Sequence, residues 1–205
     1  MPKAAMKLIR RQQLIDATLA SVALHGLQHT TINSISQLAG MSSGIISHYF
    51  SGKQGLIQAT LRHLLEQLKQ ALLNRIQGQV LAPTERLMMI VEANFTELQR
   101  SRNVTHTWLS FWAQAVHDPQ LARLQNINSR RLYSNLHFSF RHVLPKEFAL
   151  MAAEQTAAMI DGFWLRSALS ETPEQDFVQA EKLCKTFIHN VIKQHGVNTC
   201  QYQYQ

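Results

Sequence analysis

Three tryptophans and one aspartate have the spacing of a site for an organic cation. Trp108 and Trp112 are four residues apart, and Asp161 precedes Trp164 by three, so each pair would share one face of a helix. Indole faces attract quaternary ammonium ions, each contact contributing about 0.5 to 2 kcal/mol, and Asp161 could compensate the charge. The two faces could therefore form an aromatic box. The spacing alone favours the alternative, in which the tryptophans pack a core or a dimer interface and Asp161 is a paired buried acid.

Basic residues near the N-terminus indicate a second kind of chemistry. Residues 1–65 contain six Lys and Arg side chains against Asp16 alone, whereas the rest of the chain has 14 basic and 12 acidic residues. This asymmetry predicts an N-terminal segment that meets a polyanion, either nucleic acid or an anionic membrane surface. Two cysteines and the absence of a secretory signal predict a reduced, cytoplasmic protein.

The elements that position these residues are predicted to be helices. Apolar residues recur at spacings of three and four, and five prolines interrupt the chain, so we predict an all-α protein of about nine helices. In the first helix, Leu8, Leu14, Ile15, Leu19 and Val22 should face inward. The predicted ranges are 7–24, 31–38, 43–50, 53–77, 85–100, 104–116, 120–143, 147–169 and 174–195.

Residues 30–56 predict a helix-turn-helix. Thr31 can cap a short helix that ends at Gly40, Ser42 or Ser43 can cap the next, and Ser51-Gly52 can end it. In such a motif the second helix enters the DNA major groove. The small core of the motif is predicted to consist of Ile35, Leu38, Ile45 and Ile46. The alternative is a compact helical corner without a DNA-binding role.

The same segment resembles the signature of the TetR family of regulators. The matching positions are Thr31, Ile35, Ala39-Gly40, Met41-Ser42, Gly44, His48-Tyr49-Phe50, Lys53 and Leu56. Ser36 and Met41 stand where Ala and Val are commoner. The resemblance implies that His48, Tyr49 and Lys53 hold the DNA backbone and that Ser43, Gly44, Ile45 and Ser47 read bases. We expect Arg10 and Arg11 to contact phosphates or the minor groove, with Thr31 and Ser42 completing the interface.

The likeness continues through IRRQQLIDAT, WLSFWA, SRRLYSNL and IDGFWLRSALS, where it resembles the choline-responsive members of this family. It implies repression of genes for choline uptake and glycine betaine synthesis, which choline relieves by releasing the DNA or by acting on the bound repressor. The aromatic box is then the choline site. Its main candidates are Trp108, Trp112, Asp161 and Trp164, followed by Phe111, Tyr133 and Phe163. A TetR-type regulator of another pathway, with a different inducer, is the alternative.

The resemblance also implies a domain organisation. We expect a DNA-binding domain at 1–52, a connecting helix at 53–77, a ligand-binding and dimerisation domain at 78–195, and a flexible tail at 196–205. The last two long helices should pair with a second copy. A two-fold homodimer would present its recognition helices about 34 to 36 Å apart on a near-palindromic operator.

Other function classes have little support in the sequence. Common hydrolase, zinc-protease and phosphate-loop motifs are absent, so no catalytic residue, cofactor or metal is predicted. Cys184, His189, His195 and Cys200 are too far apart to stack as zinc ligands on one helix face. Membrane-surface binding by the basic first helix conflicts with the need for Leu8 to Val22 to cover the helix-turn-helix core. Activation instead of repression stays open, because the binding unit does not set the sign of regulation.

Overall fold

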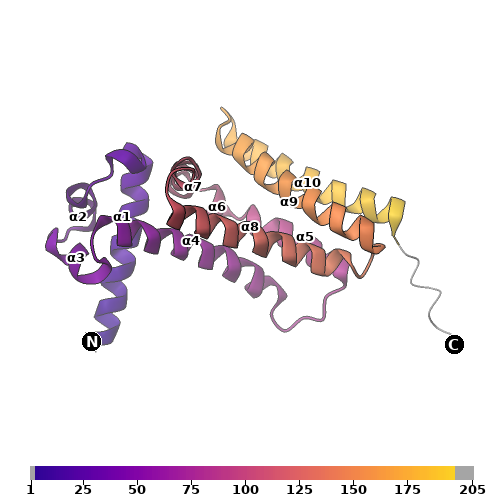
Figure 1. The fold of residues 1–205 in the computed structure, drawn as a ribbon, viewed down its shortest axis with the longest axis horizontal. Coiled ribbons are helices and arrows are strands. Elements are labelled where there is room, and N and C mark those ends of the chain that lie inside the picture. Colours follow the sequence, from indigo (N-terminus) through magenta and orange to yellow (C-terminus); the bar gives the residue numbers. More distant parts are fainter. Residues whose placement is uncertain (1–2, 197–205) are drawn as a thin grey trace. The chain divides into compact units, whose positions relative to one another are not determined.

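The computed structural model describes residues 3–196 as helices joined by short connections (Figure 1). No strand occurs in this range, and α6 is a single turn, which leaves nine longer helices and confirms the predicted all-α fold. The helices are α1 (Lys3–His29), α2 (Ile32–Ala39), α3 (Gly44–Phe50), α4 (Lys53–Ile76), α5 (Pro83–Asn94), α6 (Glu97–Arg100), α7 (Arg102–Ala115), α8 (Pro119–Phe140), α9 (Lys146–Ala168) and α10 (Pro173–His195).

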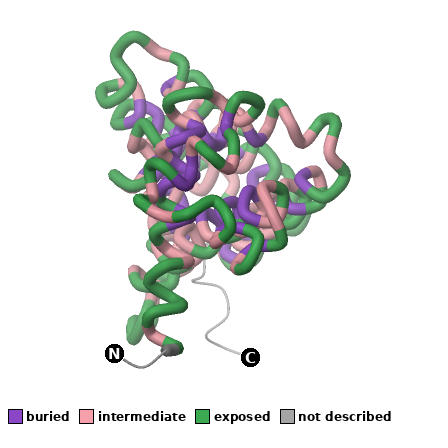
Figure 2. The backbone as a smooth tube through the Cα atoms, turned by 90° about the vertical axis from the view of Figure 1, so that its left-hand side faces the viewer, coloured by how far each residue is buried: buried purple, intermediate pink, exposed green. Residues whose placement is uncertain are grey.

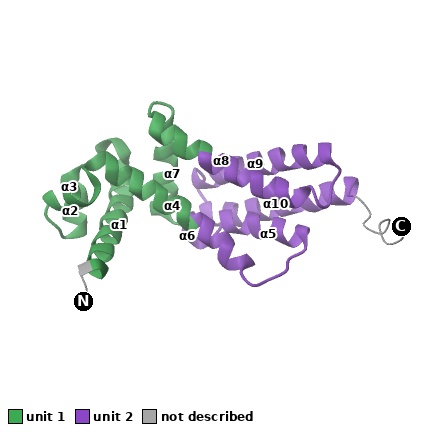
Figure 3. Cartoon of the chain, turned by 60° about the horizontal axis from the view of Figure 1, so that its bottom comes forward, with its two compact units in different colours: residues 1–67, 101–126 green, residues 68–100, 127–205 purple. Residues whose placement is uncertain are grey.

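The chain forms two compact units, which are described separately (Figure 3). Unit 1 consists of residues 1–67 and 101–126, and unit 2 of residues 68–100 and 127–205. Unit 1 therefore contains α1, α2, α3, α7 and the first parts of α4 and α8, while unit 2 contains the remaining helices. The division into domains at residues 52 and 77 stays a prediction.

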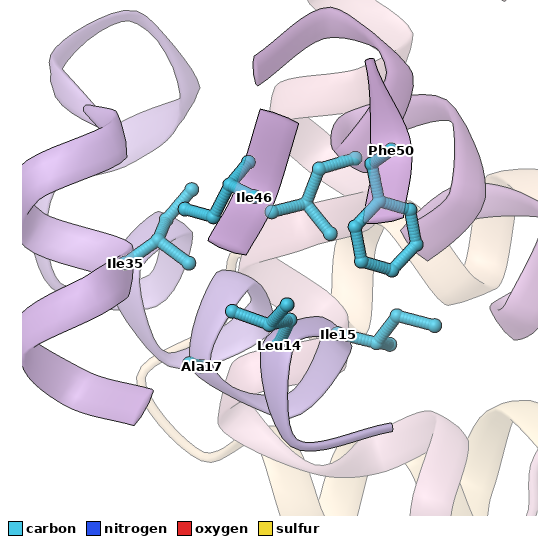
Figure 4. Close-up of a cluster of buried hydrophobic side chains, with 7 residues drawn as sticks. Leu14, Ile15, Ala17, Ile35, Ile46 and Phe50 are labelled. Atoms are coloured by element: carbon cyan, nitrogen blue, oxygen red, sulfur yellow. The ribbon is translucent and has the colours of Figure 1, made fainter. Parts of the chain in front are cut away.

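Unit 1 is built around a small apolar cluster contributed by α1, α2, α3 and α4. Leu14, Ile35, Ile46 and Leu56 have no exposed surface, and Phe50 is 7% exposed. Figure 4 shows that the side chains of α1, α2 and α3 point toward one another. Because the short helices α2 and α3 bury their apolar side chains in this cluster, the cluster fixes the orientation of α3.

Local chemistry sets the ends of the helices in this motif. Thr31 Oγ1 accepts a hydrogen bond from the Ser34 backbone, and Ser34 Oγ accepts one from the Thr31 N–H, so the predicted cap is confirmed as a reciprocal pair. Gly40 ends α2 at a φ of 62°, in the left-handed region that favours glycine. Ser43 holds the N-cap position of α3, but its side chain makes no capping hydrogen bond, contrary to the prediction.

Two predicted core positions are wrong. Leu8 is 69% exposed, because the buried positions of α1 begin only at Leu14, and the first turns of α1 are mostly exposed in Figure 2. Leu38 is 47% exposed near the end of α2, whereas Ile35, one turn earlier, occupies the core. The periodic pattern gives the spacing of apolar residues but not where the covering helices stop.

Unit 2 contains α9 and α10, which pack against each other, with α5 and α6 against α10. The predicted helix at 85–100 is broken at Phe95, whose backbone leaves the helical region (φ −115°, ψ 25°) while its ring is buried 6.4 Å from that of Phe177. Lys185 Nζ lies 2.7 Å from carboxylate oxygens of both Glu92 and Glu181. The pair with Glu92 connects α10 to α5, the pair with Glu181 lies within α10, and Glu181 also pairs with Arg100 of α6.

Candidate nucleic-acid interface and ligand-binding residues

The exposed surface of α3 and the turn before it consists of small polar residues. Ser42, Ser43, Gly44, Ser47 and His48 are exposed, as predicted for groups that meet DNA. The whole segment from Ala17 to Gly52 contains no Asp, Glu, Lys or Arg. We therefore expect contacts of this surface with DNA to be hydrogen bonds and close backbone approach, with charge supplied from neighbouring positions.

Four other predicted contacts are partly buried or have a structural role inside unit 1. Ile45 and Tyr49 are half-buried and pack against the apolar cluster, so only part of each side chain is available to DNA. Thr31 is exposed, but its hydroxyl oxygen accepts the capping hydrogen bond of α2. Lys53 is half-buried at the start of α4. Direct DNA contact by these residues stays a prediction.

Arg11 and Arg10 differ in their surroundings. Arg11 Nη1 donates a hydrogen bond of 2.8 Å to the backbone oxygen of Tyr49, and its guanidinium lies 4.4 Å from the centroid of the Phe50 ring. Both contacts are at the C-terminal end of α3, where a cation is favourable because the last carbonyl groups have no helical partner. Arg10 is exposed. Arg11 therefore stabilises the position of the recognition helix α3. The position of Arg10 and Arg11 in the sequence did not indicate this role.

We expect Arg11→Met to lower the stability of the protein by about 1 to 2 kcal/mol, because the hydrogen bond to Tyr49 and the contact with Phe50 are both lost. Arg10→Met removes the same charge from an exposed position and should leave stability nearly unchanged. Urea denaturation followed by circular dichroism measures both variants. Equal losses of stability would contradict a holding role for Arg11.

The structure requires glycine at position 55, and this requirement was not predicted from the sequence. A Cβ atom at this position would lie 1.7 Å from the Phe50 backbone oxygen, far inside van der Waals contact. The close approach arises because α4 begins directly after Ser51, which has a left-handed φ of 59°, and Gly52. The only indication of this requirement in the sequence is that a glycine lies in the first turn of a predicted helix.

The ligand candidates of unit 1 form one aromatic cluster on α7. The ring centroid of Trp108 lies 5.5 Å from that of Phe111 and 6.2 Å from that of Trp112. Trp108 and Phe111 are buried, whereas Trp112 is half-buried and its Nε1 donates a hydrogen bond of 3.0 Å to Gln125 Oε1. Trp108 and Trp112 thus lie together, as their spacing predicts.

The candidates of unit 2 lie on α8 and α9. Trp164 is buried, with its ring centroid 5.7 Å from that of Phe177 in an edge-to-face arrangement. Asp161, one turn earlier, is half-buried, and burial raises the pKa of its carboxyl group from 3.8 to about 6. Phe163 is half-buried, and the ring of Tyr133 stacks on that of His137 at 5.8 Å.

Asp161 has no charge partner among residues 3–196. No hydrogen bond or ion pair in this range involves its carboxyl group, and loss of solvation is the cause of its pKa shift. The interpretation of Asp161 as a paired buried acid is therefore wrong for this range. A half-buried carboxyl group without a counter-ion favours binding of a cation, because the ligand would restore the missing charge interaction.

The structure is also relevant to two alternative hypotheses, a zinc site near the C-terminus and a membrane-binding protein. Cys184 is buried, His189 contacts the Lys185 backbone oxygen and His195 stacks on Phe148, while Cys200 lies outside the described residues. Within residues 3–196, no three His, Cys, Asp or Glu side chains are grouped as metal ligands. None of the helices in this part of the chain is both long and apolar enough to span a membrane.

The fold and the exposed helix-turn-helix define the class of a DNA-binding regulator, and comparison with known proteins gives the family. Residues 14–60 match the model for bacterial regulatory proteins of the tetR family, and residues 83–193 match the C-terminal model for BetI-type transcriptional repressors. The chain belongs to the TetR family and has the C-terminal domain of its BetI type. It is therefore a DNA-binding transcriptional repressor and not an enzyme.

Individual relatives agree with this assignment. The chain is 50% identical to the HTH-type transcriptional regulator BetI of Paraburkholderia xenovorans, over 84% of this chain and 89% of that protein. It is 48% identical to the regulator of the same name from Burkholderia mallei, over 94% of this chain and 98% of that protein.

Solved structures share the fold at lower identity. A transcriptional regulator from Rhodococcus sp. Rha1 is 22% identical with a TM-score of 0.76, covering 92% of this chain and 98% of its own. A protein described as a transcriptional regulator from Saccharomonospora viridis, crystallised in complex with choline, is 19% identical with a TM-score of 0.73, covering 92% of this chain and 97% of its own.

Proposed function

We propose that this repressor binds a near-palindromic operator as a homodimer and that choline, a quaternary ammonium alcohol, controls the binding. Its targets are genes for choline uptake and glycine betaine synthesis, and it acts in the cytoplasm, where the chromosome lies. The relatives of 48% and 50% identity named BetI support the pathway. A protein of the same fold with choline bound supports the ligand class.

The observation that carries the choline assignment is the unpaired carboxyl group of Asp161 beside an aromatic residue. Asp161 and Trp164 are three residues apart on α9, so they share one face of the helix. The carboxyl group supplies the negative charge and the indole supplies a face for the methyl groups of the cation. Phe163 and Tyr133 of unit 2, and Trp108, Phe111 and Trp112 of unit 1, remain further candidates.

Core packing is the competing role for the aromatic residues. Trp164 is 6% exposed and contacts Phe177, and Trp108 is 4% exposed and contacts Phe111, so each stabilises its own unit. A regulator of another pathway with a different inducer would retain this packing. Such a protein would have no need for the isolated charge of Asp161, because that charge costs folding free energy.

Dimerisation through α9 and α10 is supported by their exposed apolar side chains. These two helices pack against each other and still leave large hydrophobic groups in contact with solvent. Burial of such groups against a second copy is favourable at about 25 cal/mol per Å² of apolar surface. The exposed side chains are Leu150, Met151, Leu165, Leu169, Val178 and Leu183.

Choline can change operator binding only if it binds one conformation of the repressor more tightly than another. We therefore expect millimolar choline to weaken the complex of this protein with its own upstream DNA, by about tenfold or more if the coupling is typical. A gel-shift titration with and without choline measures the effect. Acetate serves as the control for a small ion of opposite charge.

The same titration separates the two parts of the proposal. Specific DNA binding that does not respond to choline would retain the repressor and reject the ligand. A complex that persists while transcription in vitro responds to choline would show that choline acts on the bound repressor. Absence of specific binding to the upstream DNA would reject the proposed operator.

A further inference from the structure

Unit 2 contains a cavity whose chemistry is opposite to that of a choline site. Its volume is 450 Å³, and it lies between α5 and α8. This volume is within the range of small-molecule sites, about 300 to 1,000 Å³, and the cavity is a depression widely open to solvent. The residues that line it are Arg86, Arg130, Arg131, Ser134, Asn135 and Phe138.

The guanidinium group of Arg86 is held in a fixed position at this cavity. Its Nη1 donates to the Asn135 backbone oxygen at 2.8 Å and to Ser139 Oγ at 2.7 Å, and its Nη2 donates to Asn135 Oδ1 at 2.7 Å. The Asn135 amide is itself fixed by a hydrogen bond of 3.0 Å from Nδ2 to the Arg131 backbone oxygen. Arg86 retains further N–H donors, and burial lowers its pKa.

Two guanidinium groups lie near the ring of Phe138. The Arg86 guanidinium carbon lies 5.2 Å from its centroid, and that of Arg141 lies 4.7 Å from it. Aromatic faces stabilise cations without neutralising them, so the positive charge remains available to a ligand. Phe138 is 48% exposed and also offers apolar surface beside the charges.

Within residues 3–196, none of these arginines forms an ion pair with a carboxylate. The sequence contains no Asp or Glu between Asp118 and Glu147, a segment that includes Arg130, Arg131 and Arg141. Neither Arg130 nor Arg131 forms an ion pair with any residue in the described range 3–196. Several like charges around one cavity repel each other, and an anion of matching shape would relieve this repulsion.

We propose that this cavity is a second ligand site, which takes a small organic anion with a carboxylate or phosphate group. Arg130 and Arg131 bind the anionic group, Arg86 contributes its remaining donors, and Phe138 contacts the apolar part. Guanidinium groups suit both oxyanions because they donate two parallel hydrogen bonds. The same charges exclude choline from the cavity, so the two ligand classes occupy different places.

Calorimetric titration with phenyl phosphate and with citrate tests the proposal on the full-length protein. We expect at least one probe to bind the wild type, and the double variant Arg130→Gln, Arg131→Gln to weaken that binding by about tenfold or more. Arg123→Gln is the matched control, because it removes an exposed charge from an earlier part of α8 and should leave affinity unchanged. The thermal midpoints should agree among the three proteins.

Three outcomes would overturn the proposal. Neither probe binds the wild type, or the double variant binds as well as the wild type, or Arg123→Gln weakens binding as much as the double variant does. A short non-operator DNA duplex is titrated in parallel. If the double variant loses affinity for the duplex while no small probe binds, the arginines form a surface for a polyanion and not a small-molecule site.

Discussion

Gly55→Ala should reduce the stability of the protein by about 3 kcal/mol and its DNA affinity by at least tenfold. A Cβ atom at residue 55 would lie 1.7 Å from the Phe50 backbone oxygen, so one of the two backbone segments would have to shift. Phe50 is the last residue of α3 and its ring belongs to the apolar cluster, so a shift that relieves the overlap also moves the recognition helix. Urea denaturation and fluorescence anisotropy with labelled operator measure the two effects.

Gly162→Ala is the control for this experiment. Gly162 lies inside α9, and a Cβ atom there would have no atom within 4 Å. The substitution should therefore be neutral or stabilising by up to about 1 kcal/mol, because alanine favours helix. If Gly55→Ala unfolds at the same urea concentration as the wild type, the first turn of α4 can adopt another conformation. Glycine is then not required at position 55.

Choline affinity should rise about tenfold between pH 5 and pH 7 in the wild-type protein and should not depend on pH in Asp161→Asn. The carboxyl group of Asp161 has a pKa of about 6, so it is mostly protonated at pH 5 and mostly ionised at pH 7. A quaternary ammonium ion is attracted only to the ionised form. Calorimetric titration of choline over this range measures the effect, together with the proton released on binding near pH 6.

The same substitution should stabilise the protein without ligand at pH 7. The pKa of Asp161 is higher in the folded protein than its ordinary value of 3.8, so the folded state retains a proton that the unfolded chain releases. Stability therefore falls as pH rises from about 4 to about 6 and remains lower above that range. Asp161→Asn removes this penalty, and we expect a gain of about 1 to 3 kcal/mol at pH 7.

Glu154→Gln provides the matched control for Asp161→Asn. Glu154 is an exposed acid on the same helix, two turns earlier. Its replacement should leave the pH dependence of choline binding unchanged. If Asp161→Asn retains the tenfold rise, or if Glu154→Gln abolishes it, the ammonium group of choline is not held by Asp161.

The parts of the fold that depend on local chemistry were predictable from the sequence. The Thr31 cap, the left-handed Gly40 and the helix ends near residue 50 follow from side chains a few residues away. The contact between Arg11 and the Tyr49 carbonyl joins residues 38 positions apart, and Phe95, where the predicted helix breaks, packs near the ring of the distant Phe177. Such features require the tertiary structure, because residue type and spacing are the same whether or not the contact forms.

Among the candidate ligand residues, too, some features could be predicted from the sequence and others required the tertiary structure. The spacing of Trp108 and Trp112 placed them together on α7, and the structure agrees. The sequence could not show that Asp161 has no partner within residues 3–196, because that depends on every helix packed around it. It also gave no sign of the arginine-lined cavity, since Arg86 and Arg130 are 44 positions apart in the chain.

The uncharged segment from Ala17 to Gly52 affects how a repressor of this kind can diverge. The family resemblance assigns base recognition to Ser43, Gly44, Ile45 and Ser47 of this segment, whereas we expect salt-dependent attraction to DNA to come from basic residues outside it, such as Lys7 and Arg10. Exchanges among the small polar residues of α3 can therefore alter the preferred operator without altering the general affinity for DNA. A repressor encoded by a duplicated gene could acquire a preference for a new operator through a few substitutions between uncharged residues. Its rate of association with chromosomal DNA would not change.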